Sequence, residues 1–222
     1  MADENEPPID SKLTRSKQRW AAEGKFLTGK VSRPQSGRLP PGQHLTRDWP
    51  TLELGMMPQI TRERWRLDVH GAVENTIFWN FSEFQAQKQT QLLSDIHCVT
   101  TWSRYDNQWE GLATRDLLMV CRPRNEARFV ALHSHDGYTT NLALEDFAAE
   151  DALLAHSWSG QPLTSEHGGP VRLVVPHLYF WKSAKWVKAL NFTAKNEPGF
   201  WELRGYHLYG DPWREQRYTD DP

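Results

Sequence analysis

Short segments of the chain alternate between apolar and polar residues. In WRLDVHGAV, residues 65–73, the alternation holds over the first six positions, as expected for a strand with one buried and one exposed face. RFVALHS (128–134), VRLVVP (171–176) and KWVKALNFT (185–193) are further strand candidates. These segments predict a protein with several short strands.

Other segments predict helices. Asn80 and Glu83 in NFSE have the spacing of a capping box, which starts a short helix. Thr114 is expected to cap a second helix, TRDLLMVCR, and LEDFAAEDALLAH (144–156) predicts a third. Strands mixed irregularly with short helices favour an α+β fold over a regular β–α–β winding.

The two ends of the chain differ in composition. Residues 1–40 are polar and rich in proline near their end, so we expect an N-terminal arm that is flexible or packed on the surface. Residues 41–222 would form the single domain that a chain of 222 residues favours. The tail, residues 199–218, carries too many aromatic residues for a solvated linker and is expected to pack back on the body.

Charge and hydropathy argue against two kinds of partner. The net charge is −2 and the isoelectric point is about 6.5, so no basic excess is present to neutralise a nucleic acid. No run approaches the roughly 18 consecutive apolar residues of a membrane span. The N-terminal segment has no hydrophobic region typical of a signal peptide. We therefore expect a cytoplasmic protein with reduced thiols.

Cys98 is one of only two cysteines, and it lies in the segment DIHCVTTWSRYDNQWEG, residues 95–111. It could be a buried thiol that acts as a small hydrophobic residue. A structural zinc site would need about four protein ligands, and no CxxC pair is present. A nucleophilic thiol would need a base that the sequence cannot place. A further option is a single thiolate completing a metal whose other ligands come from an organic cofactor.

A second candidate site is HGGPVRLVVPHLYFWKSAKW, residues 167–186. Its potential cations and its serine are His167, Arg172, Lys182, Lys185 and Ser183. Such a set suits a phosphate monoester, and Gly168 and Gly169 would let the backbone approach a ligand closely. The alternative is a solvated basic stretch beside a strand. Neither a P-loop nor a dinucleotide fingerprint is present.

Two weaker signals leave further alternatives open. His133 and His135 would share one face of a strand and could form a metal pair, although histidines at a strand end are more often incidental. The eleven tryptophans could form a platform for sugars or flat ligands, or could mainly line the core and a cofactor pocket.

The motifs IHCVTTWS, WEG, DGYTTNL, GGPVRLVVP, KSAKW and PGFWE occur in this order along the chain. In order and spacing they resemble the sulfite oxidase-type molybdopterin-dependent oxidoreductases, above all small stand-alone bacterial members. A more distant likeness is to the periplasmic methionine sulfoxide reductase catalytic subunits. The resemblance runs from about Pro40 to Tyr218. It implies an α+β fold of mixed β-sheets with short peripheral helices, and a molybdenum-bearing pyranopterin, with the simple form favoured over a nucleotide-extended one.

The resemblance also implies roles for individual residues. Cys98 matches the cysteine whose thiolate binds molybdenum directly, and a soft thiolate suits such a metal. Arg104 and Tyr138 are expected to face the metal and the substrate pocket. The residues expected to contact the pyranopterin or its phosphate are His44, Arg47, Asp48, Ser134, His167, Arg172, Ser183, Ala184 and Lys185.

The implied function is two-electron oxidoreduction, by oxygen-atom transfer to or from a small S- or N-oxide or a sulfite-like substrate. Because no haem or iron–sulfur motif is visible, electrons would pass through a separate partner. The arginine-rich CxxxRR surroundings of sulfite oxidases are replaced here by CVTTWSR, which argues against sulfite itself. The alternative is a non-catalytic module that binds a pterin or another flat ligand. The sequence does not determine the oligomeric state.

Overall fold

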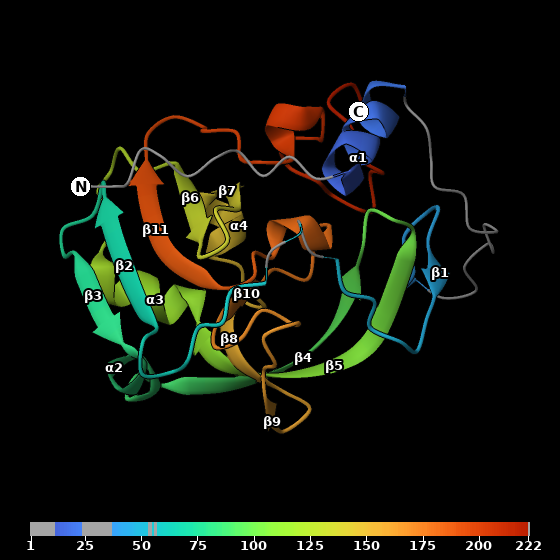
Figure 1. Ribbon diagram of the computed structural model, residues 1–222. Helices are drawn as coiled ribbons and strands as arrows, with labels where there is room; N and C mark the ends of the chain where they lie inside the picture. The colour runs from blue at the N-terminus through green and yellow to red at the C-terminus, as the bar shows by residue number, and fades with distance from the viewer. Residues whose placement is uncertain (1–11, 24–36, 53–54, 56, 222) are drawn as a thin grey trace.

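The computed structural model describes residues 12–23, 37–52, 55 and 57–221. Two β-sheets form its frame (Figure 1). One sheet has the order β1 (His44–Leu45), β5 (Trp102–Ala113), β8 (Leu153–Trp158) and β10 (Arg172–Val174), with β4 (Gln89–His97) paired to β5 and β9 (Gln161–Pro162) paired to β8. The other has the order β3 (Ile77–Asn80), β2 (Arg66–Gly71), β11 (Val187–Thr193), β6 (Phe129–Ser134) and β7 (Thr139–Ala143).

Both sheets are mixed, and the helices that accompany them are short. β1 pairs in parallel with β5 and β11 pairs in parallel with β2, whereas the other pairs are antiparallel. The helices are α1 (Lys12–Ala22), α2 (Phe81–Gln85), α3 (Thr114–Cys121), α4 (Leu144–Phe147) and the 3-10 turns η1 (Phe180–Lys182) and η2 (Glu202–Arg204). The expected α+β architecture is confirmed. None of the described helices is long and apolar enough to cross a membrane.

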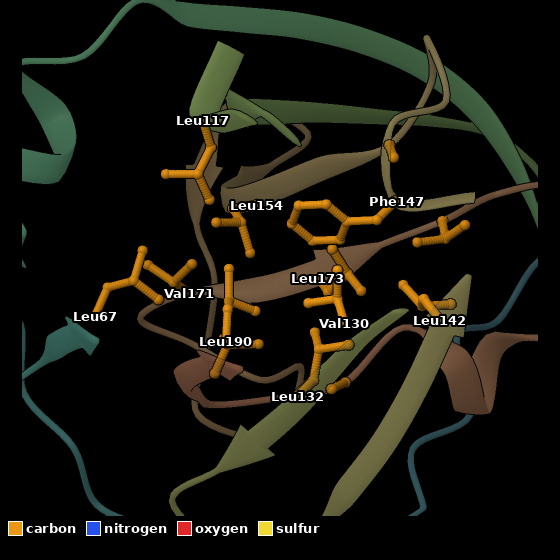
Figure 2. Close-up of a cluster of buried hydrophobic side chains, with 14 of the residues drawn as sticks. Leu67, Leu117, Val130, Leu132, Leu142, Phe147, Leu154, Val171, Leu173 and Leu190 are labelled. Carbon is orange, nitrogen blue, oxygen red and sulfur yellow. The ribbon is translucent and has the colours of Figure 1, made fainter. Parts of the chain in front are cut away.

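The main core lies where the two sheets face each other. Figure 2 shows Leu67 and Leu190 of one sheet near Leu154 and Leu173 of the other, with Phe147 of α4 beside them. All five side chains are fully buried. Burying one such side chain stabilises the fold by about 1.5–3 kcal/mol, so this core fixes how the sheets meet.

The strands expected from alternation and the capping box are confirmed. Oδ1 of Asn80 accepts a hydrogen bond from the Glu83 N–H at 3.0 Å, and Oε2 of Glu83 accepts from the Asn80 N–H at 2.7 Å. The prediction that Thr114 caps a helix is wrong, because the N-cap of α3 is Ala113. Oγ1 of Thr114 instead donates to the carbonyl oxygens of Phe147 and Ala152.

The helix predicted over residues 144–156 is also wrong. Only Leu144–Phe147 is helical, and the chain then enters β8, which lies between β5 and β10. Residues 152–157 are buried without interruption, which is typical of a strand covered on both faces. Pairing on both edges therefore outweighs the helix propensity of this segment.

The aromatic tail packs back on the body as predicted. Phe200, Trp201 and Tyr206 are buried in the main core cluster, and Ala21 of α1 belongs to the same cluster. Figure 1 shows α1 next to the C-terminal segment. Residues 1–11 and 24–36 of the predicted arm lie outside the described residues, and the arm boundary at residue 40 stays a prediction.

Candidate functional site

Cys98 lies in the tight turn that joins β4 to β5. Its N–H donates to the carbonyl of Trp102 at 2.8 Å, and its own carbonyl accepts from the Thr101 N–H at 3.0 Å. Thr101 has a φ of 74°, the left-handed conformation that closes the turn. Sγ of Cys98 lies 3.1 Å from Oγ1 of Thr100. The hairpin thus holds the thiol at a fixed position, where it is 8% exposed.

The thiol lines a cavity whose walls are mostly aromatic. Trp49, Trp102, Trp186 and Phe180 contribute to these walls. The residues expected from the sequence that line the same cavity are Cys98, Tyr138, His167, Arg172, Ser183, Ala184 and Lys185. The structure therefore brings the hairpin turn and the 167–186 segment, which are far apart in the sequence, to one cavity.

Arg172 is a buried cation in the cavity wall. Its guanidinium donates to the carbonyl oxygens of Leu173 (3.3 Å), His167 (2.9 Å) and Ser183 (2.8 Å). Two of its five N–H donors have no partner among the described residues, and no described carboxylate pairs with it. Burial lowers its pKa to about 9, so it is protonated at neutral pH. A buried charge of this kind requires a counter-ion, and an anionic ligand would provide one.

His167 offers a second open polar atom. Its ring stacks on Trp49 with 3.9 Å between centroids, and its Nδ1 lies 3.0 Å from Oγ1 of Thr164. Nε2 is buried and has no hydrogen-bond partner among the described residues. Burial, reinforced by the charge of Arg172, lowers the pKa of His167, so the ring is neutral at neutral pH. One ring nitrogen is therefore available to a ligand.

The segment 183–185 joins β10 to β11 beside these groups. Oγ of Ser183 accepts from the Val175 N–H at 2.9 Å, and Nζ of Lys185 donates to the Glu166 carbonyl at 3.0 Å. The neighbouring Gly168 has a φ of +96°, and a Cβ there would lie 2.8 Å from Cβ of Lys185. Gly168 is therefore needed for close packing against Lys185, and the ligand approach expected from the sequence stays a prediction.

Lys182 does not belong to the cationic cluster in which the sequence analysis placed it. It is fully buried and pairs with Glu202, so that prediction is wrong. Tyr138 does line the cavity, and its hydroxyl donates to the Trp181 carbonyl at 2.6 Å. Burial, with a further contribution from the charge of Glu202, raises the pKa of Tyr138 well above its ordinary value. Tyr138 is therefore neutral at neutral pH.

Several expected contact residues do not line the cavity in the described part of the chain. They are His44, Arg47, Asp48, Arg104 and Ser134. Nε of Arg104 donates to the Arg47 carbonyl at 3.1 Å, which ties β5 to the segment after β1. Oγ of Ser134 is buried at the end of β6 and meets no hydrogen-bond partner in the described ranges. Their roles at a cofactor stay predictions.

Sequence reasoning missed several residues of the cavity wall. Trp49, Asp136, Trp201 and Tyr206 line it, as does Lys17 of α1. Nothing in the polar sequence KLTRSKQRWAA distinguishes Lys17 from its solvated neighbours. Trp201 and Tyr206 belong to the aromatic tail, whose composition indicated packing without indicating where.

The donor set fits a molybdenum–pterin cofactor. Arg172 and the open Nε2 of His167 offer hydrogen bonds to a phosphate or a pterin, and the Cys98 thiol offers the soft ligand that molybdenum needs. Within the described ranges, no three side chains of His, Cys, Asp or Glu come together as a metal site. The possible metal pair of His133 and His135 therefore has no third protein ligand among those residues.

Comparison with known proteins gives three findings. The chain is 48% identical over 188 residues to the uncharacterized oxidoreductase YuiH of Bacillus subtilis strain 168, covering 84% of this chain and 95% of that protein. It is 26% identical over 180 residues to the protein-methionine-sulfoxide reductase catalytic subunit MsrP of Campylobacter jejuni. That match covers 71% of this chain and 58% of MsrP. The crystal structure of the sulfane dehydrogenase SoxCD from Paracoccus pantotrophus matches with a TM-score of 0.58 at 20% identity. The match covers 63% of this chain and 40% of the SoxCD chain.

The last match confirms the sulfite oxidase-type fold. A sequence profile described as the oxidoreductase molybdopterin binding domain matches residues 54–201, a range that includes Cys98 and the 167–186 segment. The chain therefore belongs to the oxidoreductase molybdopterin-binding family, and it is an oxidoreductase whose cofactor is molybdopterin with molybdenum.

Proposed function

We propose that this oxidoreductase transfers an oxygen atom to or from a small S- or N-oxide or a sulfite-like substrate, and exchanges electrons with a separate partner. The observation that carries the proposal is the single cavity shared by the Cys98 thiol and the uncompensated Arg172 cation. A metal-binding sulfur and an anion-binding guanidinium in one cavity match the two ends of a molybdenum–pterin phosphate.

In this proposal the protein binds and orients the cofactor. Cys98 would hold molybdenum through its sulfur, and the β4–β5 turn fixes where that sulfur lies. Arg172, with His167 and the 183–185 segment, would hold the pterin and its phosphate. When bound, the cofactor supplies the two-electron oxygen-atom chemistry. The aromatic walls exclude water, which strengthens every charged contact inside.

The substrate class and the form of the pterin are each supported by a different observation. The name of the Campylobacter jejuni relative supports an S-oxide substrate, although the chain spans 58% of that protein. The short phosphate-binding segment, residues 183–185, favours the simple pterin form over a nucleotide-extended one. The separate electron partner and the cytoplasmic location stay predictions.

The test is metal and pterin analysis of the protein expressed in a host that makes the cofactor. Cys98→Ala and Cys121→Ala form a matched pair, because Cys121 is buried on α3 and does not line the cavity. We expect near-stoichiometric molybdenum in the wild type and in Cys121→Ala. Molybdenum should be lost in Cys98→Ala while pterin is partly retained.

Two results would contradict the proposal at different levels. A metal-free wild type, or full molybdenum in Cys98→Ala, would remove Cys98 from the metal site. If the wild type does contain molybdenum, its turnover is measured with a redox dye and methionine sulfoxide, trimethylamine N-oxide or sulfite as the substrate. Absence of turnover with all of them would favour the alternative function, a module that holds the pterin without catalysis.

A further inference from the structure

Helix α1 supplies part of the cavity wall. Leu13 and Lys17 both line the cavity, and their spacing of four residues places them on one face of the helix. The same face carries the buried residues Thr14 and Ala21. Lys17 is only 4% exposed, although its neighbours in the chain, Ser16 and Gln18, are more exposed. The helix therefore places a largely buried lysine in the wall that also contains Cys98.

Lys17 has no counter-ion in the described structure. Its Nζ donates no hydrogen bond and forms no ion pair with a described residue, and the Trp20 ring lies 5.9 Å away. The carboxylates of the cavity wall are engaged elsewhere. Asp136 accepts from the Tyr138 N–H at 3.0 Å, and Glu166 accepts from the Thr51 hydroxyl at 2.7 Å. The largely buried Lys17 side chain thus has no anionic partner among the described residues, and an anion in the cavity would offset the cost of burying its charge.

The charges in the cavity separate into two groups. Arg172 and Lys185 belong to the 167–186 segment, to which the proposed function assigns the phosphate. Lys17 instead belongs to α1, outside that segment, and lines the same cavity as Cys98. Lys17 is therefore a cation of the cavity wall to which the proposed function assigns no part of the phosphate.

We infer that Lys17 binds and orients the substrate, and that the substrate is a small oxyanion. The inference rests on the proposed function, since it places the substrate at the metal that Cys98 would hold. An ammonium group carries three rotatable donors on a flexible stem, so it can follow an oxygen atom of a small ligand. One cation also agrees with the replacement of the arginine-rich cysteine surroundings by CVTTWSR, because Lys17 supplies from α1 a charge that this segment lacks.

The experiment is a calorimetric titration of the molybdenum-loaded protein with sulfate, a small oxyanion, in the absence of any electron donor. Dimethyl sulfone is the uncharged probe of similar shape. We expect sulfate to bind the wild type more tightly than dimethyl sulfone does. Lys17→Met should weaken sulfate binding by about ten- to one-hundredfold, the loss of one charge-assisted hydrogen bond, and Lys17→Arg should keep most of the affinity. Lys12→Met is the matched control, because Lys12 is exposed on the same helix.

The molybdenum and pterin contents of each variant separate this inference from the proposed function. Unchanged sulfate affinity in loaded Lys17→Met, or equal affinity of the wild type for sulfate and dimethyl sulfone, overturns the role of Lys17 and leaves the cofactor site standing. An equal loss in Lys12→Met also overturns it, since the effect would then belong to the charge of the helix. A wild type that never loads molybdenum overturns both proposals.

Discussion

Nζ of Lys182 lies 2.5 Å from Oε1 of Glu202, and neither side chain is exposed to solvent. The same ammonium group donates to the carbonyl oxygens of Asn141 at 3.0 Å and Leu208 at 2.5 Å. The same Glu202 oxygen accepts from Nε1 of Trp181, a residue of the cavity wall, at 3.1 Å. This buried pair therefore joins η1, β7 and the C-terminal segment directly behind the cavity.

Lys182→Met is expected to destabilise the protein by about 3–5 kcal/mol, because it leaves the Glu202 carboxylate buried without its partner. Urea unfolding measures the loss. The double variant Lys182→Met with Glu202→Leu should recover part of it, since both charges are then removed. Lys195→Met is the control, because Lys195 is exposed and its replacement should change stability by less than about 0.5 kcal/mol. A similarly small effect of Lys182→Met would contradict the importance of the pair.

The strand pattern was readable because burial on one face leaves alternation in the sequence, as in residues 65–73. Residues 144–156 show where this reasoning fails. Their composition favours a helix, whereas β8 is selected by pairing with β5 and β10, strands that lie far away in the sequence. Local pattern cannot report such pairing. The capping box of Asn80 and Glu83 was readable because both partners are local.

The candidate site also contains residues that the sequence could predict and residues that it could not. Motif likeness led to Cys98, His167 and Arg172, and the structure places them in one cavity. Lys182 and Lys185 could not be told apart from composition, because the 3-10 turn η1 decides that one is buried against Glu202 while the other lines the cavity. Lys17 could not be found, because its burial depends on where α1 packs.

Arg172→Met is expected to weaken retention of the pterin by about ten- to one-hundredfold, the cost of losing a charge-assisted contact to a phosphate. Arg172→Lys should retain an intermediate amount, because a lysine keeps the charge and loses the planar fork of donors. Fluorescence of the oxidised pterin released from purified protein measures the content. Arg128→Met, at an exposed position outside the cavity, is the control. Full pterin content in Arg172→Met would exclude Arg172 from the phosphate site.

Gly111→Ala is expected to disrupt the contact between β5 and β8. A Cβ at Gly111 would lie 2.0 Å from the carbonyl oxygen of Leu154 and 2.7 Å from Cα of Ala155, and backbone atoms of a central strand cannot move aside cheaply. Overpacking of this kind costs about 1–3 kcal/mol or more. Gly37→Ala is the matched control, because a Cβ there meets nothing within 4 Å. Thermal unfolding should show a lower Tm for Gly111→Ala alone, and equal Tm values would contradict the close approach.

His177 links the loop after β10 to α4 and to the turn that follows it. Its Nε2 lies 3.0 Å from Oδ1 of Asp146, and its Nδ1 lies 3.5 Å from Oδ1 of Asp151. Burial alone would lower the pKa of His177, but the hydrogen bonds and charges of the two aspartates raise it to about 9. The folded state therefore holds this proton more tightly than the unfolded chain, in which the pKa of histidine is about 6.5.

His177→Gln is accordingly expected to destabilise the protein in a pH-dependent way. The wild-type stabilisation is fully present below about pH 6.5 and is lost as the pH rises through about 9. Because the His177 side chain is 33% exposed, solvent screening reduces the difference at pH 6 to about 1–2 kcal/mol. Denaturant unfolding of both proteins at pH 6 and pH 10 measures it, and groups that titrate in both proteins cancel in the difference. A difference of the same size at both pH values would show that the imidazolium does not bind the two aspartates.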